Sequence, residues 1–82
     1  MTSNWENRTD HLYLKLKFKS FKEAIKCINL IADISEELNH HPTMINSYTS
    51  LELKLTTHDN GNTITELDFQ LAKEIDKALS LL

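Results

Sequence analysis

The sequence has 82 residues and contains only one cysteine, one proline and one glycine. Because Cys27 has no partner in the chain, no internal disulfide can form, which fits a reducing compartment. A lone glycine, Gly61, excludes a glycine-rich loop that cradles phosphate. No run approaches the ~20 apolar residues of a membrane span, and the opening stretch MTSNWENRTD lacks the pattern of a secretory leader. We therefore expect a cytoplasmic protein.

The chain also has no excess of positively charged residues. The chain has 9 Lys and Arg against 12 Asp and Glu, a formal net charge of −3 at pH 7. This balance gives no overall attraction to nucleic acid or to an anionic membrane, and we expect neither as a partner. The nearest feature to a basic patch consists of Lys15, Lys17, Lys19, Lys22 and Lys26. A solvated face explains these lysines best, because acidic residues take over from Asp33 onward.

The length and the composition favour one small globular domain, residues 1–82. The chain is 40% apolar and 26% charged, as in ordinary folded proteins. So short a chain leaves much surface for its volume, so its own core is only marginally stabilising. We expect it to associate into a homodimer or a homotetramer.

The first half of the chain predicts a strand followed by a helix. Apolar and polar residues alternate from His11 to Phe18, the period of a half-buried strand. Ser20, with Glu23 three residues later, forms a capping-box pattern and starts a helix that we expect to run to Asn39. Pro42 prevents the helix from continuing. The expected apolar stripe of this helix is Phe21, Ala24, Ile25, Ile28, Ile31, Ala32 and Leu38.

The second half predicts a hairpin and a second helix. Residues 43–47 and 50–57 are the expected strands, joined by a tight turn at Tyr48 and Thr49. By the alternation of the second strand, His58 at its end points away from the leucine face. After the polar loop DNGNT, the last helix has two candidate caps, Thr63 with Glu66 or Thr65 with Asp68. Its expected stripe is Leu67, Leu71, Ala72, Ile75, Leu79 and Leu82.

These elements indicate an α+β fold, an antiparallel sheet with helices on one face. Phe69 lies off the stripe of the last helix. It is either an exposed single side chain or part of a subunit contact.

Three histidines, His40, His41 and His58, lie where these elements end. They could bind zinc, but two adjacent rings converge poorly on one ion, and neither HExxH nor paired cysteines accompany them. Surface histidines near a helix end would explain His40 or His41 but not His58. Cys27 falls within an apolar stripe, which favours a buried thiol over a nucleophile. Acid–base catalysis by imidazole remains, since this ring exchanges protons near neutral pH.

The spacing of these residues resembles the pterin-4a-carbinolamine dehydratase family. The resemblance rests on Glu36, His40-His41-Pro42, Tyr48, His58 and Asp68. Trp5 and the stretch KFKSFKEA upstream are also similar to that family, so the resemblance spans nearly the whole chain.

The resemblance implies a four-stranded antiparallel sheet with helices packed on one face, the fourth strand lying around Trp5. It implies assembly through edge strands and helices into dimers or tetramers. The implied reaction is loss of water from a 4a-hydroxytetrahydropterin to give quinonoid dihydropterin, a step of tetrahydrobiopterin recycling. It needs no metal and no organic cofactor. The alternative is a non-catalytic pterin- or protein-binding module with a dimerisation-cofactor or molybdopterin-related role.

The resemblance also implies roles for individual residues. His40 and His58 would be the acid–base pair, and His41 would hold or orient the pterin. The substrate-orienting residues would be Glu36, Pro42 and Asp68.

From the residues alone, Glu36 could equally orient the His40 ring or be a solvated carboxylate, and Asp68 could cap a helix as well. This chain departs from the family at Thr43, Met44 and Leu67, and its loop from His58 to Asp68 is one residue longer than in some relatives. We expect these departures to affect pterin preference more than the fold.

Overall fold

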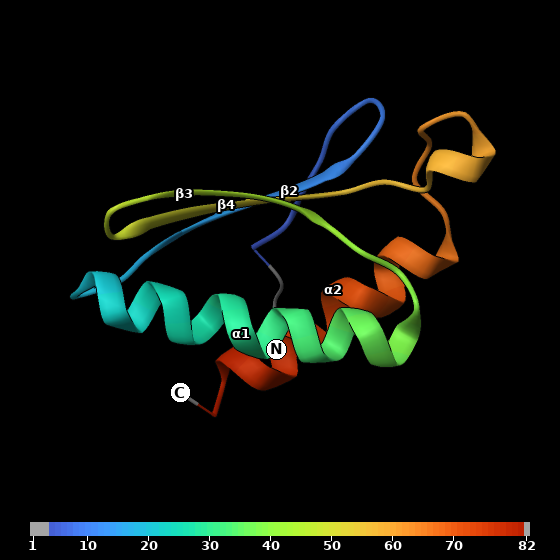
Figure 1. Ribbon diagram of the computed structural model, residues 1–82. Helices are drawn as coiled ribbons and strands as arrows, with labels where there is room; N and C mark the ends of the chain where they lie inside the picture. Colours follow the sequence, from blue (N-terminus) through green and yellow to red (C-terminus); the bar gives the residue numbers. More distant parts are fainter. Residues whose placement is uncertain (1–3, 82) are drawn as a thin grey trace.

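The computed structural model describes residues 4–81, and Figure 1 shows both of its helices on the same face of one sheet. The elements are β1 (Glu6–Asn7), β2 (Leu12–Lys17), α1 (Phe21–Leu38), β3 (Thr43–Ser47), β4 (Ser50–Leu55), the 3₁₀ turn η1 (His58–Asn60) and α2 (Glu66–Leu79). Within this range four strands pair antiparallel in the order β1-β2-β4-β3. The α+β fold is therefore confirmed, including a two-residue strand next to Trp5. Neither helix in residues 4–81 has the length and apolar character needed to cross a membrane.

Alternating leucines of the two central strands form the sheet side of the core. Leu14 pairs with Leu53 across β2 and β4, and Leu16 pairs with Leu51. The helices bury apolar side chains in the same core, among them Ile31, Leu71 and Ile75. Each fully buried side chain of this size contributes about 1.5–3 kcal/mol. The predicted leucine face is thus the face that the helices cover.

The two ends of α1 are set by local hydrogen bonds. Ser20 Oγ accepts the amide N–H of Glu23 at 3.2 Å, and the Glu23 carboxylate accepts the amide of Lys19, one residue before the expected partner. At the other end Asn39 has φ 53°, in the left-handed region. The amide of His40 then donates to the Ser35 carbonyl at 3.1 Å, which closes the helix. This reversal turns the chain back toward the start of α2 before Pro42.

Both predicted helix stripes are wrong in their first turns. Phe21 is 47% exposed and Leu67 is 46% exposed. The buried faces instead include two residues that the stripes omit, Ser35 on α1 and Asp68 on α2. The buried position of Cys27 agrees with its interpretation as an inert thiol. Leu82, the last member of the expected α2 stripe, lies outside the described residues.

The strand β4 ends earlier than predicted. Its last residue is Leu55, and Thr57 forms an isolated bridge with Thr63. Because Thr63 is used in this bridge, Thr65 caps α2, which settles the choice between the two caps. His58 lies in η1, so its direction does not follow from the alternation of the strand.

The segment before β1 is tied to the last helix. Trp5 packs against the core, and its indole Nε1 donates to Asp76 Oδ1 on α2 at 2.9 Å. Glu6 pairs with Tyr13 and Asn7 with Leu12. A strand of two residues is too short to show alternation, which is why only the resemblance predicted it.

Candidate active site

A pocket of about 220 Å³ lies where α1 ends and α2 begins. These two helix ends lie on the right in Figure 1. The lining residues of the pocket are Asn39, His40, His41, Thr57, His58, Asp59 and Leu67. The turn after α1 supplies His40 and His41, and η1 supplies His58. The structure therefore brings the three predicted histidines together around one pocket. Pro42 follows them directly but is not among the lining residues.

His40 is held by a buried carboxylate. Its Nε2 lies 2.6 Å from Asp68 Oδ1, and the side chains are 12% and 0% exposed. The other oxygen, Asp68 Oδ2, accepts the hydroxyl of Thr57 at 2.8 Å and the amide of Thr65 at 2.9 Å. The carboxylate accepts from these donors and orients the imidazole so that Nε2 carries a proton and Nδ1 is the acceptor nitrogen of the neutral ring.

The same carboxylate caps α2, so the predicted capping role occurs together with the contact to His40. Thr57 Oγ1 lies 2.6 Å from Thr65 Oγ1. Because the Thr57 proton goes to Asp68, Thr65 donates in this pair, while its oxygen accepts the amide of Leu67 at 3.3 Å. Thr57 and Thr65 were not predicted as members of the site. Their signal was the capping pattern at Thr65 and the position of Thr57 beside His58.

Glu36 contacts a different histidine from the one predicted. Its Oε2 lies 2.6 Å from Nε2 of His41, and both side chains are largely exposed. The prediction that it orients His40 assumed helical spacing through residue 40, but the left-handed turn at Asn39 rotates His40 toward Asp68. An exposed ion pair of this kind contributes at most about 1 kcal/mol. Its effect is thus mainly to orient the ring of His41.

His58 is exposed, and a neighbouring amide holds its ring. Its Nδ1 lies 2.7 Å from Asn62 Oδ1, four residues further along the loop. The pocket therefore contains one imidazole backed by a buried carboxylate and another backed by a neutral amide.

Comparison with known proteins identifies the family of this chain. Residues 1–78 match the family model of pterin 4 alpha carbinolamine dehydratase. The chain belongs to this family. A pterin-4-alpha-carbinolamine dehydratase homologue from Prochlorococcus marinus is 46% identical over 72 residues, which are 88% of this chain and 74% of the relative. A second homologue, from Thermomicrobium roseum, is 40% identical over 76 residues, 93% of this chain and 81% of that one.

Solved structures of pterin dehydratases and dehydratase-like proteins share the fold. A transcriptional coactivator/pterin dehydratase from Brucella melitensis superposes with a TM-score of 0.82 at 31% identity, covering 89% of this chain and 79% of its own. A pterin dehydratase-like protein identified as a RuBisCO assembly factor in the alpha-carboxysome has a TM-score of 0.72 at 18% identity, covering 94% and 88%. At that identity the second match shows a common fold alone.

Among residues 4–81, no group of three His, Cys, Asp or Glu side chains is placed to hold a metal ion. Burial raises the pKa of the Cys27 thiol and disfavours the thiolate, the form of cysteine that acts as a nucleophile. The titratable groups of the pocket are its three imidazoles and the carboxylates of Asp59 and Asp68.

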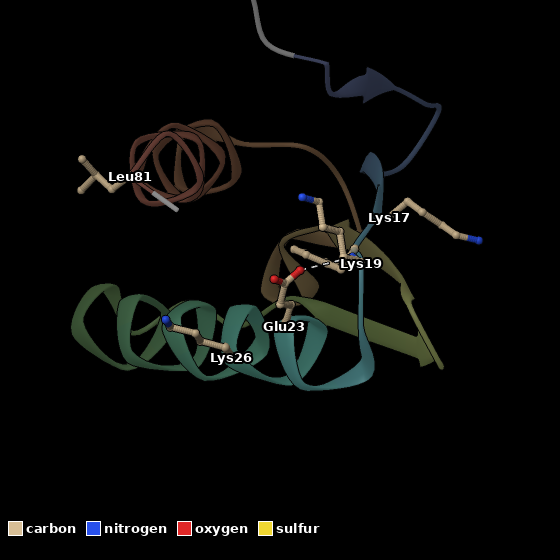
Figure 2. Close-up of a pocket in the computed structure, with 6 residues that line it drawn as sticks. Lys17, Lys19, Glu23, Lys26 and Leu81 are labelled. Atoms are coloured by element: carbon tan, nitrogen blue, oxygen red, sulfur yellow. Dashed lines mark hydrogen bonds between the residues drawn. The ribbon is translucent and has the colours of Figure 1, made fainter.

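A larger hollow of about 520 Å³ lies near the other end of α1 (Figure 2). Its lining residues are Lys17, Phe18, Lys19, Glu23, Lys26 and Leu81. The carboxylate of Glu23 is engaged with the amide of Lys19, as the dashed line in Figure 2 marks. This hollow contains neither an imidazole nor an acid–base pair, so we place the candidate active site of this dehydratase-family protein at the histidines.

Proposed function

We propose that the protein is a 4a-hydroxytetrahydrobiopterin dehydratase, a hydro-lyase of cytoplasmic tetrahydrobiopterin recycling. Its substrate is a 4a-hydroxytetrahydropterin, and its product is a quinonoid dihydropterin. The observation that carries the proposal is the contact of 2.6 Å between His40 and the buried Asp68, in a pocket that His58 also lines. Family membership supports the same chemistry.

The two imidazoles suit the two proton transfers that the dehydration requires. Hydroxide is a poor leaving group, so an acid must protonate the oxygen on C4a as the C4a–O bond breaks. A base must take the proton from the neighbouring ring nitrogen, whose electron pair then forms the double bond to C4a. Water leaves, and no oxidant or cofactor takes part.

The partners of the two rings favour His40 as the base and His58 as the acid. When Nδ1 of His40 accepts a proton, the ring becomes a cation, and the adjacent carboxylate of Asp68 stabilises that charge. The ring of His58 is backed by a neutral amide, which does not stabilise the imidazolium as a carboxylate would. Because His58 is exposed, solvent returns that proton after each turnover.

We assign substrate binding to the rim of the pocket. His41 lines it, and Glu36 orients the ring. Leu67 also lines the pocket while 46% exposed, so it offers an apolar surface to the face or the substituent of a pterin. Asp68 acts behind His40 and does not face the substrate.

The second candidate function is a non-catalytic pterin- or protein-binding module. It is kept because the RuBisCO assembly factor, a pterin dehydratase-like protein, has the same fold. A module that only binds a partner does not require a buried carboxylate behind a histidine, and that pair therefore favours catalysis.

A stopped-flow absorbance assay of 4a-hydroxytetrahydropterin dehydration separates the two functions. We expect His40→Ala and His58→Ala each to lower kcat by about 10²–10⁴-fold, the usual contribution of a positioned acid or base. His41→Ala should raise KM more than it lowers kcat, the pattern of lost uniform binding. His11→Ala is the matched control, since that histidine lies outside the pocket lining. A purified protein that gives only the spontaneous rate would favour the binding module.

A further inference from the structure

The loop that carries His58 is closed by its own backbone. Its two turn residues, Gly61 and Asn62, have φ of 70° and 57°, both in the left-handed region. The Gly61 amide donates to the His58 carbonyl, and the Asn62 amide donates to the Thr57 carbonyl, each at 3.1 Å. The Thr57 amide donates to the Thr63 carbonyl at 2.9 Å. The backbone of Asn62 is therefore fixed beside the ring of His58.

The side chain of Asn62 makes one hydrogen bond to that ring. Its Oδ1 lies 2.7 Å from Nδ1 of His58. An amide oxygen only accepts, so Nδ1 of His58 carries a proton and Nε2 is the acceptor nitrogen of the neutral ring. His40 has the opposite arrangement, because its Nε2 is the nitrogen held by Asp68. The two imidazoles thus exchange protons through different ring nitrogens.

We infer that Asn62 is a positioning residue for His58, holding the proton on Nδ1 and presenting Nε2 to the substrate. This inference rests on the proposed function, in which His58 is the acid. Asparagine suits the position for two reasons. It tolerates the left-handed backbone better than other non-glycine residues, and its uncharged oxygen orients the ring without stabilising the imidazolium. A carboxylate at this point would hold the proton that the acid must release.

The charged surroundings of His58 decide how a substitution will act. The titratable groups that share its pocket are His40, His41 and Asp59, and Asp68 lies buried behind His40. A carboxylate at position 62 would lie where the Asn62 oxygen now contacts Nδ1. Its effect on the pH dependence adds to that of these groups, which the substitution leaves unchanged.

Two substitutions test the inference without straining the loop. Asn62→Gly keeps the left-handed backbone and removes the acceptor, and we expect kcat to fall about tenfold, the loss of one orienting hydrogen bond. KM should stay within about twofold, since Asn62 does not line the pocket. Asn62→Asp keeps an acceptor but adds charge, so the alkaline limb of the pH–rate profile should move about one unit higher. Asn29→Asp, with the same added charge on the exposed side of α1, should leave the profile unchanged.

The nitrogen-15 spectrum of the histidine side chains tests the tautomer without any activity. Above its titration range, His58 should be protonated on Nδ1 in the wild-type protein and in Asn62→Asp. In Asn62→Gly the proton should move largely to Nε2, with the His40 signals unchanged. A wild-type ring protonated on Nε2, or an Asn62→Gly variant with wild-type kcat, would overturn the inference.

A double-mutant cycle separates this inference from the proposed function. In a His58→Ala background, Asn62→Gly should cause no further loss of kcat, because its effect passes through the missing ring. An undiminished further loss would show that Asn62 acts on the loop alone and would overturn the inference. If His58→Ala itself keeps full activity while the tautomer is as expected, the acid role fails and the hydrogen-bond assignment stands.

Discussion

The buried carboxylate of Asp68 should make a large contribution to stability, and substitutions at this residue test the described hydrogen bonds directly. In Asp68→Ala, the hydroxyl of Thr57 and the amide of Thr65 lose their acceptor. Each buried unsatisfied donor costs about 1–3 kcal/mol. We expect the free energy of unfolding to fall by about 3–5 kcal/mol in total. A chain of this length has only about 4–12 kcal/mol available, so the variant should lose a large share of its stability.

Asp68→Asn should separate stability from catalysis. The amide oxygen can still accept from Thr57 and Thr65, so we expect a stability loss of only about 1–2 kcal/mol. Its nitrogen would then donate to Nε2 of His40, which forces the ring proton onto Nδ1. The base is lost, and kcat should fall by about 10²–10⁴-fold while the protein remains folded.

Urea unfolding monitored by the fluorescence of Trp5, the single tryptophan, measures both variants. Glu66→Ala is the matched control, because Glu66 lies exposed in the same first turn of α2. Surface substitutions of this type usually change stability by less than about 0.5 kcal/mol. If Asp68→Ala loses no more stability than Glu66→Ala, the buried hydrogen-bond network around Asp68 does not exist as described.

Two further predictions concern the sheet. The hydrogen bond to Glu52 raises the pKa of Tyr13 above its ordinary value of 10.0. The stabilisation from this bond is therefore complete below pH 10.0 and is lost as the pH rises through the pKa of the folded protein. Ultraviolet titration should show a high midpoint for the Tyr13 phenol, and this midpoint should fall in Glu52→Gln. Light scattering should give a dimer or a tetramer of the 9.5 kDa chain, because the edge strand β3 (Thr43–Ser47) pairs on one side only, and a mass near 9.5 kDa at micromolar concentration would contradict this.

Most of the fold could be predicted because its signals are local. The leucine alternation of β2 and β4 follows from a period of two, and Ser20 and Pro42 bound α1 through hydrogen bonds and sterics that act within a few residues. Burial in the first helical turns could not be predicted the same way. Phe21 and Leu67 have the right spacing, but whether a partner covers them depends on where the helix starts relative to the sheet.

The sequence predicted that the three histidines belong together, and they line one pocket, but it did not predict which carboxylate contacts His40. Which carboxylate reaches His40 depends on a single backbone angle, the left-handed φ of Asn39. Helical spacing predicted Glu36 as the partner of His40. Because the chain reverses at Asn39, the partner is instead Asp68, which is 28 residues away in sequence. Thr57 was assigned to a strand because alternation does not show where a strand stops. Contacts between distant element ends arise from tertiary packing, and a single sequence has no local signal for them.

The shared carboxylate of Asp68 has a consequence for the evolution of this chain. Active-site residues commonly lower the stability of the folded protein, so substitutions that raise stability tend to reduce activity. Here one side chain caps α2 and holds His40, and a substitution that removes the whole carboxyl group, such as Asp68→Ala, damages both roles. Selection for persistence of the folded chain alone would therefore retain Asp68 even in a lineage that no longer needs the reaction. A descendant that keeps this aspartate but has lost its histidines would be a non-catalytic protein whose fold still depends on a former active-site residue.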